Sequence, residues 1–152
     1  MGTEHAAATL LVLDTNIVLD LFVFRDPATR PLEAALALGT LDWLATAAMR
    51  DELEHVMAYA QIASRLALAQ LRTQDVLARF DRHARIVQAP AKAPVTCSDP
   101  DDQKFIDLAV SHRCLLLSKD AAVLKLRRKL AALQVSVVAA MPPNSSYRLT
   151  GL

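Results

Sequence analysis

The chain has 152 residues, of which 53% are hydrophobic and 22% are charged, and its formal net charge is +1 at pH 7. These values fit one domain with a single hydrophobic core, so we expect residues 1–152 to form one domain with a disordered tail from about residue 142. The uncharged apolar runs are too short to cross a bilayer and no basic-led signal peptide precedes them, which predicts a cytoplasmic protein without a membrane partner.

Five apolar segments are predicted to be β-strands. In chain order they span residues 9–14, 41–46, 85–88, 114–118 and 135–138. The first and the last two are continuous apolar runs, which is typical of strands buried on both faces of a parallel sheet. The other two segments are weaker candidates that would bring the sheet to about five strands.

Segments with helical periodicity separate these strands. They cover residues 16–24, 29–38, 47–60, 62–83 with a break, 101–112 and 121–132. Three prolines between residues 90 and 100 predict a loop within the same domain. The alternation of strand and helix predicts the α/β class, with a parallel, about five-stranded sheet sandwiched by helices in three layers, α/β/α.

Acidic side chains follow two of the predicted strands. Asp14 ends the first strand. Asp120 lies two residues after Ser118, the last residue of the predicted strand at 114–118. In open parallel sheets the ligand site lies beyond the carboxyl ends of the strands, where the strand order reverses. Asp14 could instead serve only as the N-cap of the next helix, although a capping aspartate does not need Asn16 beside it.

Glu52 is the acid of the third predicted helix that we expect near this edge. It lies at the border of the apolar stripe, whereas Asp51 and Glu54 point toward solvent. A long carboxylate at that border can reach over the end of the sheet. The alternative is an ordinary boundary glutamate paired with Arg50 or His55.

The segment "SDPDDQKFIDLAV" combines a helix start with an inward-facing acid. Asp99 is the predicted N-cap, and Pro100 takes the first helical position. Asp102 lies on nearly the same face as Phe105 and Ala109, which define the buried side of the helix. An unpaired buried carboxylate is costly, so Asp102 needs a partner, which could be a metal ion.

Four acids therefore converge on one edge of the sheet, with three polar residues beside them. The acids are Asp14, Glu52, Asp102 and Asp120, and the flanking residues are Asn16, Ser118 and Asp99. Oxygen-only clusters suit hard cations such as Mg²⁺ or Mn²⁺, which bind phosphate oxygens and activate water for phosphodiester hydrolysis. Two cysteines without a nearby histidine at zinc-ligand spacing argue against zinc.

Charge is distributed unevenly along the chain. Residues 1–102 hold 14 acidic and 9 basic side chains, a net charge of −5, and residues 103–152 hold 2 acidic and 8 basic ones, a net charge of +6. A basic stretch from residue 119 to 129 could contact phosphates, or could be a solvated helix face. Its predicted RNA-binding residues are Lys119, Lys125, Arg127, Arg128 and Lys129.

Four motifs in this order resemble the PIN-domain family, in particular its bacterial branch of toxins from toxin–antitoxin pairs. The motifs are "LVLDTNIVLD", "DELEHV", "DPDDQKFIDLAV" and "LLLSKDAAVL". The resemblance implies a five-stranded parallel sheet between helices and a metal-dependent endoribonuclease that cleaves single-stranded RNA. It implies that Asp14 and Asp102 are the principal metal ligands and that Glu52 and Asp120 complete an acidic quartet.

The same resemblance implies that Asn16 and Ser118 orient ligands or water, although threonine is frequent in the family where this chain has Ser118. It also suggests an antitoxin partner and a homodimer. Leu66, Leu68 and Leu71 could supply a dimer interface, or they could belong to the core.

Other functions fit parts of the pattern. Haloacid-dehalogenase-like phosphatases place a nucleophilic aspartate where Asp14 stands, but they need a second aspartate where this chain has Asn16. A receiver domain would use Lys119, but no phosphoacceptor aspartate ends a middle strand. A non-catalytic PIN-like module that binds RNA or protein is the third alternative.

Overall fold

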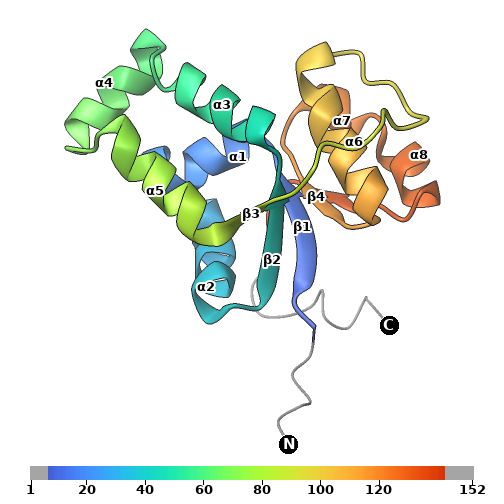
Figure 1. The fold of residues 1–152 in the computed structure, drawn as a ribbon. Coiled ribbons are helices and arrows are strands. Elements are labelled where there is room, and N and C mark those ends of the chain that lie inside the picture. Colours follow the sequence, from blue (N-terminus) through green and yellow to red (C-terminus); the bar gives the residue numbers. More distant parts are fainter. Residues whose placement is uncertain (1–6, 143–152) are drawn as a thin grey trace, which may run out of the picture.

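The predicted sheet is confirmed, with five parallel strands in the spatial order β3-β2-β1-β4-β5. The computed structural model describes residues 7–142. The strands are β1 Thr9–Leu13, β2 Leu41–Ala45, β3 Ala84–Ile86, β4 Leu115–Leu117 and β5 Val137–Val138. The α/β/α class is confirmed as well, because helices α1 to α5 lie on one side of the strands and α6 to α8 on the other (Figure 1).

Within residues 7–142, eight α-helices cover the sheet. They are α1 Thr15–Leu19, α2 Arg30–Leu38, α3 Ala47–Val56, α4 Ala60–Leu68, α5 Thr73–His83, α6 Gln103–His112, α7 Ala121–Leu124 and α8 Arg127–Ala132. Two 3₁₀-helices, Pro27–Thr29 and Pro100–Asp102, precede α2 and α6. In residues 7–142, no helix is both long and apolar enough to span a bilayer.

Strand β1 is the centre of the sheet, and the site depends on its position. Leu11 of β1 is aligned with Trp43 of β2 on one side and with Leu115 of β4 on the other. The chain order reverses at β1, which opens a crevice beyond the carboxyl ends of β1 and β4. The continuous apolar run of β1 follows from burial on both faces, since Leu11 and Val12 are fully buried.

Two predicted helices are divided in the structure. The helix expected at 16–24 is α1 followed by a π-helix, Asp20–Phe24, which ends where Arg25 adopts a left-handed conformation with φ of 54°. The helix expected at 121–132 is divided into α7 and α8. Apolar periodicity continues across both divisions, so the pattern alone did not reveal them.

The leucines considered for an interface have different environments. Leu66 of α4 packs in the core, whereas Leu68 at the end of that helix is 80% exposed, and Leu71 is partly buried in the break before α5. The predicted break within 62–83 therefore lies between α4 and α5. The tail expected after about residue 142 lies outside the described residues.

Candidate metal centre

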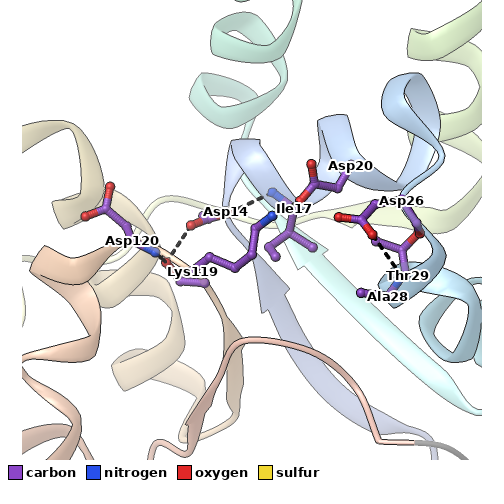
Figure 2. Close-up of polar contacts among 9 residues, drawn as sticks. Asp14, Ile17, Asp20, Asp26, Ala28, Thr29, Lys119 and Asp120 are labelled. Carbon is purple, nitrogen blue, oxygen red and sulfur yellow. Dashed lines mark hydrogen bonds and ion pairs between the residues drawn. The ribbon is translucent and has the colours of Figure 1, made fainter.

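Asp14 occupies the crevice as a buried carboxylate with two protein donors. It is the N-cap of α1, where Oδ1 accepts from the backbone N–H of Ile17 at 2.9 Å. Its Oδ2 accepts from the hydroxyl of Ser118 at 2.5 Å. Figure 2 shows Asp14 between Ile17 and Asp120. Burial raises the pKa of Asp14 above its ordinary value, outweighing these two hydrogen bonds. The capping role is therefore present, but it uses only one oxygen of the carboxylate.

Ser118 joins two of the predicted acids. The residue is fully buried directly after β4, and its Oγ accepts from the backbone N–H of Asp120 at 3.1 Å while donating to Asp14. Asp120 in turn caps α7, because its Oδ1 accepts from the N–H of Ala122 at 2.8 Å. This chain of contacts fixes the ends of β1 and β4 relative to each other.

Asp102 carries the unsatisfied group of the site. It is 8% exposed, and its Oδ2 is the buried side-chain oxygen in residues 7–142 that lacks a hydrogen-bond partner. One carboxylate oxygen each from Asp99, Asp102 and Asp120 lie within 4.8 Å of one another. Burial, followed by the charges of Asp120 and Asp99, raises the pKa of Asp102 to about 7. The inward orientation predicted from the sequence is present.

Glu52 reaches the crevice from α3, as the border of its apolar stripe predicted. Its Oε2 accepts from the Thr15 hydroxyl at 2.9 Å, and its Oε1 forms an ion pair with Lys104 of α6. The alternative pairing with Arg50 is wrong, because that guanidinium binds Asp81 at 2.7 and 2.8 Å. Glu52 thus connects the helices on the two sides of the crevice.

Sequence analysis assigned no role in the site to Thr15 or Lys104, although the hydroxyl of Thr15 stands beside Asp14 at the end of the first strand. Lys104 also donates to the backbone carbonyl of Asp101 at 2.7 Å, which holds it at the start of α6. A signal existed, since Lys104 is the one basic residue within "DPDDQKFIDLAV". No local pattern indicates that it meets Glu52, because the contact requires the two helices to be placed on either side of β1.

All four predicted acids line one cavity of about 190 Å³. Its acidic lining residues are Asp14, Glu52, Asp99, Asp101, Asp102 and Asp120. Asn16 also lines it and is exposed, so it is free to contact a ligand. Asp99, expected as a flanking cap, indeed caps the 3₁₀-helix but also belongs to the closest group of carboxylates.

The donor set fits a hard divalent cation. Carboxylate oxygens are the ligands that Mg²⁺ and Mn²⁺ prefer, and a buried carboxylate without a partner is stabilised when a cation neutralises it. Asp102 is such a group. Asp14 and Glu52 are already bound by protein donors, but each carboxylate oxygen keeps a second lone pair for a further contact.

The predicted RNA-binding residues have two different environments. Lys119 extends past Asp14 to form an ion pair with Asp20 at the start of the π-helix (Figure 2), and this carboxylate raises the pKa of Lys119. The remaining basic residues are exposed on and around α7 and α8 and form no ion pair within residues 7–142. They are Lys125, Arg127, Arg128 and Lys129.

A family model described as PIN domain matches residues 10–122, from the second residue of β1 into α7. The matched part contains every residue of the acidic cavity and leaves out α8 and β5. A search of curated proteins finds no match to the chain.

Proposed function

Because the chain belongs to the PIN-domain family, whose members are generally metal-dependent nucleases, we propose that it is an endoribonuclease that hydrolyses single-stranded RNA. The observation that supports this proposal most strongly is that Oδ2 of Asp102, beside Asp99 and Asp120 in the acidic cavity, has no hydrogen-bond partner. A site that only stabilised the fold would not need a buried carboxylate left without a donor.

We assign the cation to the acids of this cavity and expect Mg²⁺ or Mn²⁺. Asp102 and Asp14 are the proposed principal ligands, with Asp120 and Glu52 completing the set directly or through water, and Asp99 supporting them. When bound, the ion neutralises phosphate charge and lowers the pKa of a water that attacks phosphorus.

The protein groups around the ion hold the acids and the substrate in place. Ser118 and the N–H of Ile17 fix the orientation of Asp14, so little reorganisation is needed when a ligand binds. Asn16, which lines the cavity and is exposed, is proposed to orient a ligand or a water. Lys104 places a positive charge beside Glu52, where it also attracts the phosphate of an incoming strand.

The exposed basic residues on α7 and α8 are proposed to hold the RNA backbone without reading bases. Each guanidinium or ammonium there is free to contact a phosphate, and such contacts are independent of sequence. Lys119 already forms an ion pair with Asp20, so its contribution to RNA binding is expected to be smaller.

We also propose that the protein acts in the cytoplasm as the toxin of a toxin–antitoxin pair and forms a homodimer. The exposed apolar side chains Leu68 of α4 and Tyr59 beside its start, at 80% and 53% exposure, are consistent with a protein contact. Size measurement of the purified protein tests the dimer.

The function is tested by incubating the purified protein with end-labelled single-stranded RNA and, in parallel, a duplex of the same sequence. Cleavage of the single strand is expected with Mn²⁺ or Mg²⁺ and not with EDTA. Ca²⁺ is expected to bind but to support cleavage poorly, because its looser coordination positions water less well. RNA binding without cleavage under every metal condition would instead support the non-catalytic PIN-like module.

A further inference from the structure

A second cavity, of about 230 Å³, lies away from the acidic one and shares no lining residue with it. Its lining residues come from the π-helix and its end, from α2 and from α5. Helices α2 and α5 lie on the side of the sheet that carries α1 to α5 (Figure 1). Arg79, Arg82 and His83 line it from the last turns of α5, and Arg25 and Glu33 face them from the end of the π-helix and from α2.

Positive charge in this cavity is poorly compensated. Three guanidinium groups face a single carboxylate, Glu33, which is 3.8 Å from Arg25, and both side chains are more than half exposed. Exposed pairs of this length contribute little free energy. The remaining donors of Arg25 therefore stay available to a ligand.

The side chains of the two arginines of α5 have even fewer partners. Arg79 donates only a long hydrogen bond, 3.4 Å, to the backbone carbonyl of Phe22, and the guanidinium of Arg82 makes no hydrogen bond or ion pair within residues 7–142. Asp75, one turn before Arg79, binds the backbone and guanidinium of Arg72. Arg79 and Arg82 are three residues apart, so they project from one face of α5.

The floor of this cavity is apolar and aromatic. Leu21, Phe22 and Leu36 are buried beneath it, and the rings of Phe22 and His83 stack with centroids 6.5 Å apart at an interplanar angle of 23°. Burial, followed by the charge of Arg82, lowers the pKa of His83, so its ring is neutral near pH 7 and can donate or accept a hydrogen bond.

We propose that this arginine cavity, lined by Arg25, Arg79, Arg82 and His83, binds a phosphate group carried by a nucleotide. Planar guanidinium groups match phosphate oxygens in bidentate geometry, and an apolar, aromatic floor suits the sugar or base attached to the phosphate. The phosphate comes from the RNA strand or from a free nucleotide. The first source rests on the proposed function, and the second does not.

The test compares wild-type protein with Arg79→Gln/Arg82→Gln. Arg113→Gln is the matched control, because Arg113 is an exposed arginine at the end of α6 that does not line the cavity. Arg82→Gln alone, at an exposed position, is the second variant if the double one does not fold. In EDTA, so that no RNA is cleaved, binding of a labelled single-stranded RNA is measured by anisotropy at several salt concentrations. Melting temperatures are measured with inorganic phosphate and with adenosine monophosphate.

If the RNA strand is the source, the slope of log affinity against log salt falls by about 1.4 in the double variant, or about 0.7 in the single one, and stays at the wild-type value in Arg113→Gln. If a free nucleotide is the source, the RNA slope is unchanged, but adenosine monophosphate raises the melting temperature of wild type and Arg113→Gln and not of the cavity variants. Inorganic phosphate alone should give a smaller rise, because it leaves the apolar floor uncovered.

The proposal is overturned if the cavity variants match wild type in the RNA slope and in the response to both phosphate ligands. These readouts do not depend on cleavage. A wild type that never cuts RNA with Mn²⁺ but shows the expected nucleotide response would refute the proposed function and leave the phosphate site intact.

Discussion

Ser118 and Asp14 are 104 positions apart in the chain, yet the Ser118 hydroxyl donates a hydrogen bond of 2.5 Å to the Asp14 carboxylate. The bond joins the ends of β1 and β4, the two strands between which the crevice opens. It is also the largest of the contributions that lower the pKa of Asp14 against the effect of burial. The geometry of the acidic cavity and the stability of the sheet thus depend on the same contact.

Replacing Ser118 by alanine is expected to lower the free energy of unfolding by about 1–3 kcal/mol, the usual cost of leaving a buried polar group without its partner. The control is Ser111→Ala, at an exposed position of α6, which should change stability by less than about 0.5 kcal/mol. Urea unfolding of both variants measures the difference. Equal stability of the two would show that the Ser118 bond contributes nothing.

The metal-free protein should become more stable as pH falls. The folded pKa of Asp102, about 7, lies above its unfolded value of 3.8, so between these values the folded state binds more protons and stability is lost as pH rises through 7. In EDTA, the free energy of unfolding should be up to about 2 kcal/mol higher at about pH 5.5 than at about pH 7.5. This value follows from about 1.4 kcal/mol for each pH unit between about 5.5 and the folded pKa of about 7.

Asp102→Asn removes this titrating carboxyl group and should reduce the pH dependence, leaving the smaller part that comes from the raised pKa of Asp14. Asp51→Asn, at an exposed position of α3, should leave the pH dependence unchanged. Comparing each variant with wild type cancels the titration of the histidines. A wild type whose stability in EDTA falls on acidification to the same extent as that of Asp102→Asn contradicts the assigned pKa.

Metal binding should appear as added stability. Mn²⁺ or Mg²⁺ at about 100 times its dissociation constant stabilises a folded protein by roughly 2.7 kcal/mol, provided that the unfolded chain does not bind it. Wild type and Asp51→Asn should show this rise in thermal melts, and Asp102→Asn should not. A rise of the same size in Asp102→Asn would place the ion elsewhere.

Lys104→Met should move two affinities in opposite directions. Removing the cation beside Glu52 leaves the acidic cavity more negative, so Mn²⁺ should bind several-fold more tightly, by about 1 kcal/mol, measured by calorimetry. Single-stranded RNA, measured in EDTA, should bind more weakly. Lys104→Arg keeps the charge and should resemble wild type in both. If Lys104→Met weakens the binding of both Mn²⁺ and RNA, the role of Lys104 is structural, and its charge does not offset the negative charge of the acidic cavity.

Much of this arrangement could be predicted from the sequence, because it depends on local patterns. The strands are short apolar runs, and Asp14, Asp99 and Asp120 stand where helix starts and strand ends require polar residues. The amphipathic pattern of α3 was enough to predict that Glu52, and not Asp51, lies at the crevice.

What could not be predicted depends on contacts between distant elements. The Glu52–Lys104 ion pair and the Lys119–Asp20 ion pair both join opposite sides of the crevice, and no spacing within one helix reveals either. The same is true of the arginine cavity, because the π-helix that brings Arg25 toward α5 has the same apolar pattern as an ordinary α-helix.

The basic surface of α7 and α8 has its own test. Arg127→Gln/Arg128→Gln should lower the slope of log RNA affinity against log salt by about 1.4, because each phosphate contact on a single strand contributes about 0.7. Affinity should fall to the same extent for RNAs of different sequence. Arg113→Gln serves again as the control, and an unchanged slope in the double variant would place the RNA on another surface.

The assignment of a catalytic ion to Asp102 is tested by the single-turnover rate of single-stranded RNA cleavage by Asp102→Asn at saturating Mn²⁺, with Asp51→Asn prepared and purified in parallel. If Asp102 holds a catalytic ion, the loss of several kcal/mol of transition-state stabilisation should slow Asp102→Asn by about a hundredfold or more, while Asp51→Asn cleaves at the wild-type rate. Equal cleavage by Asp102→Asn and wild type, in preparations free of contaminating ribonuclease, would show that Asp102 holds no catalytic ion.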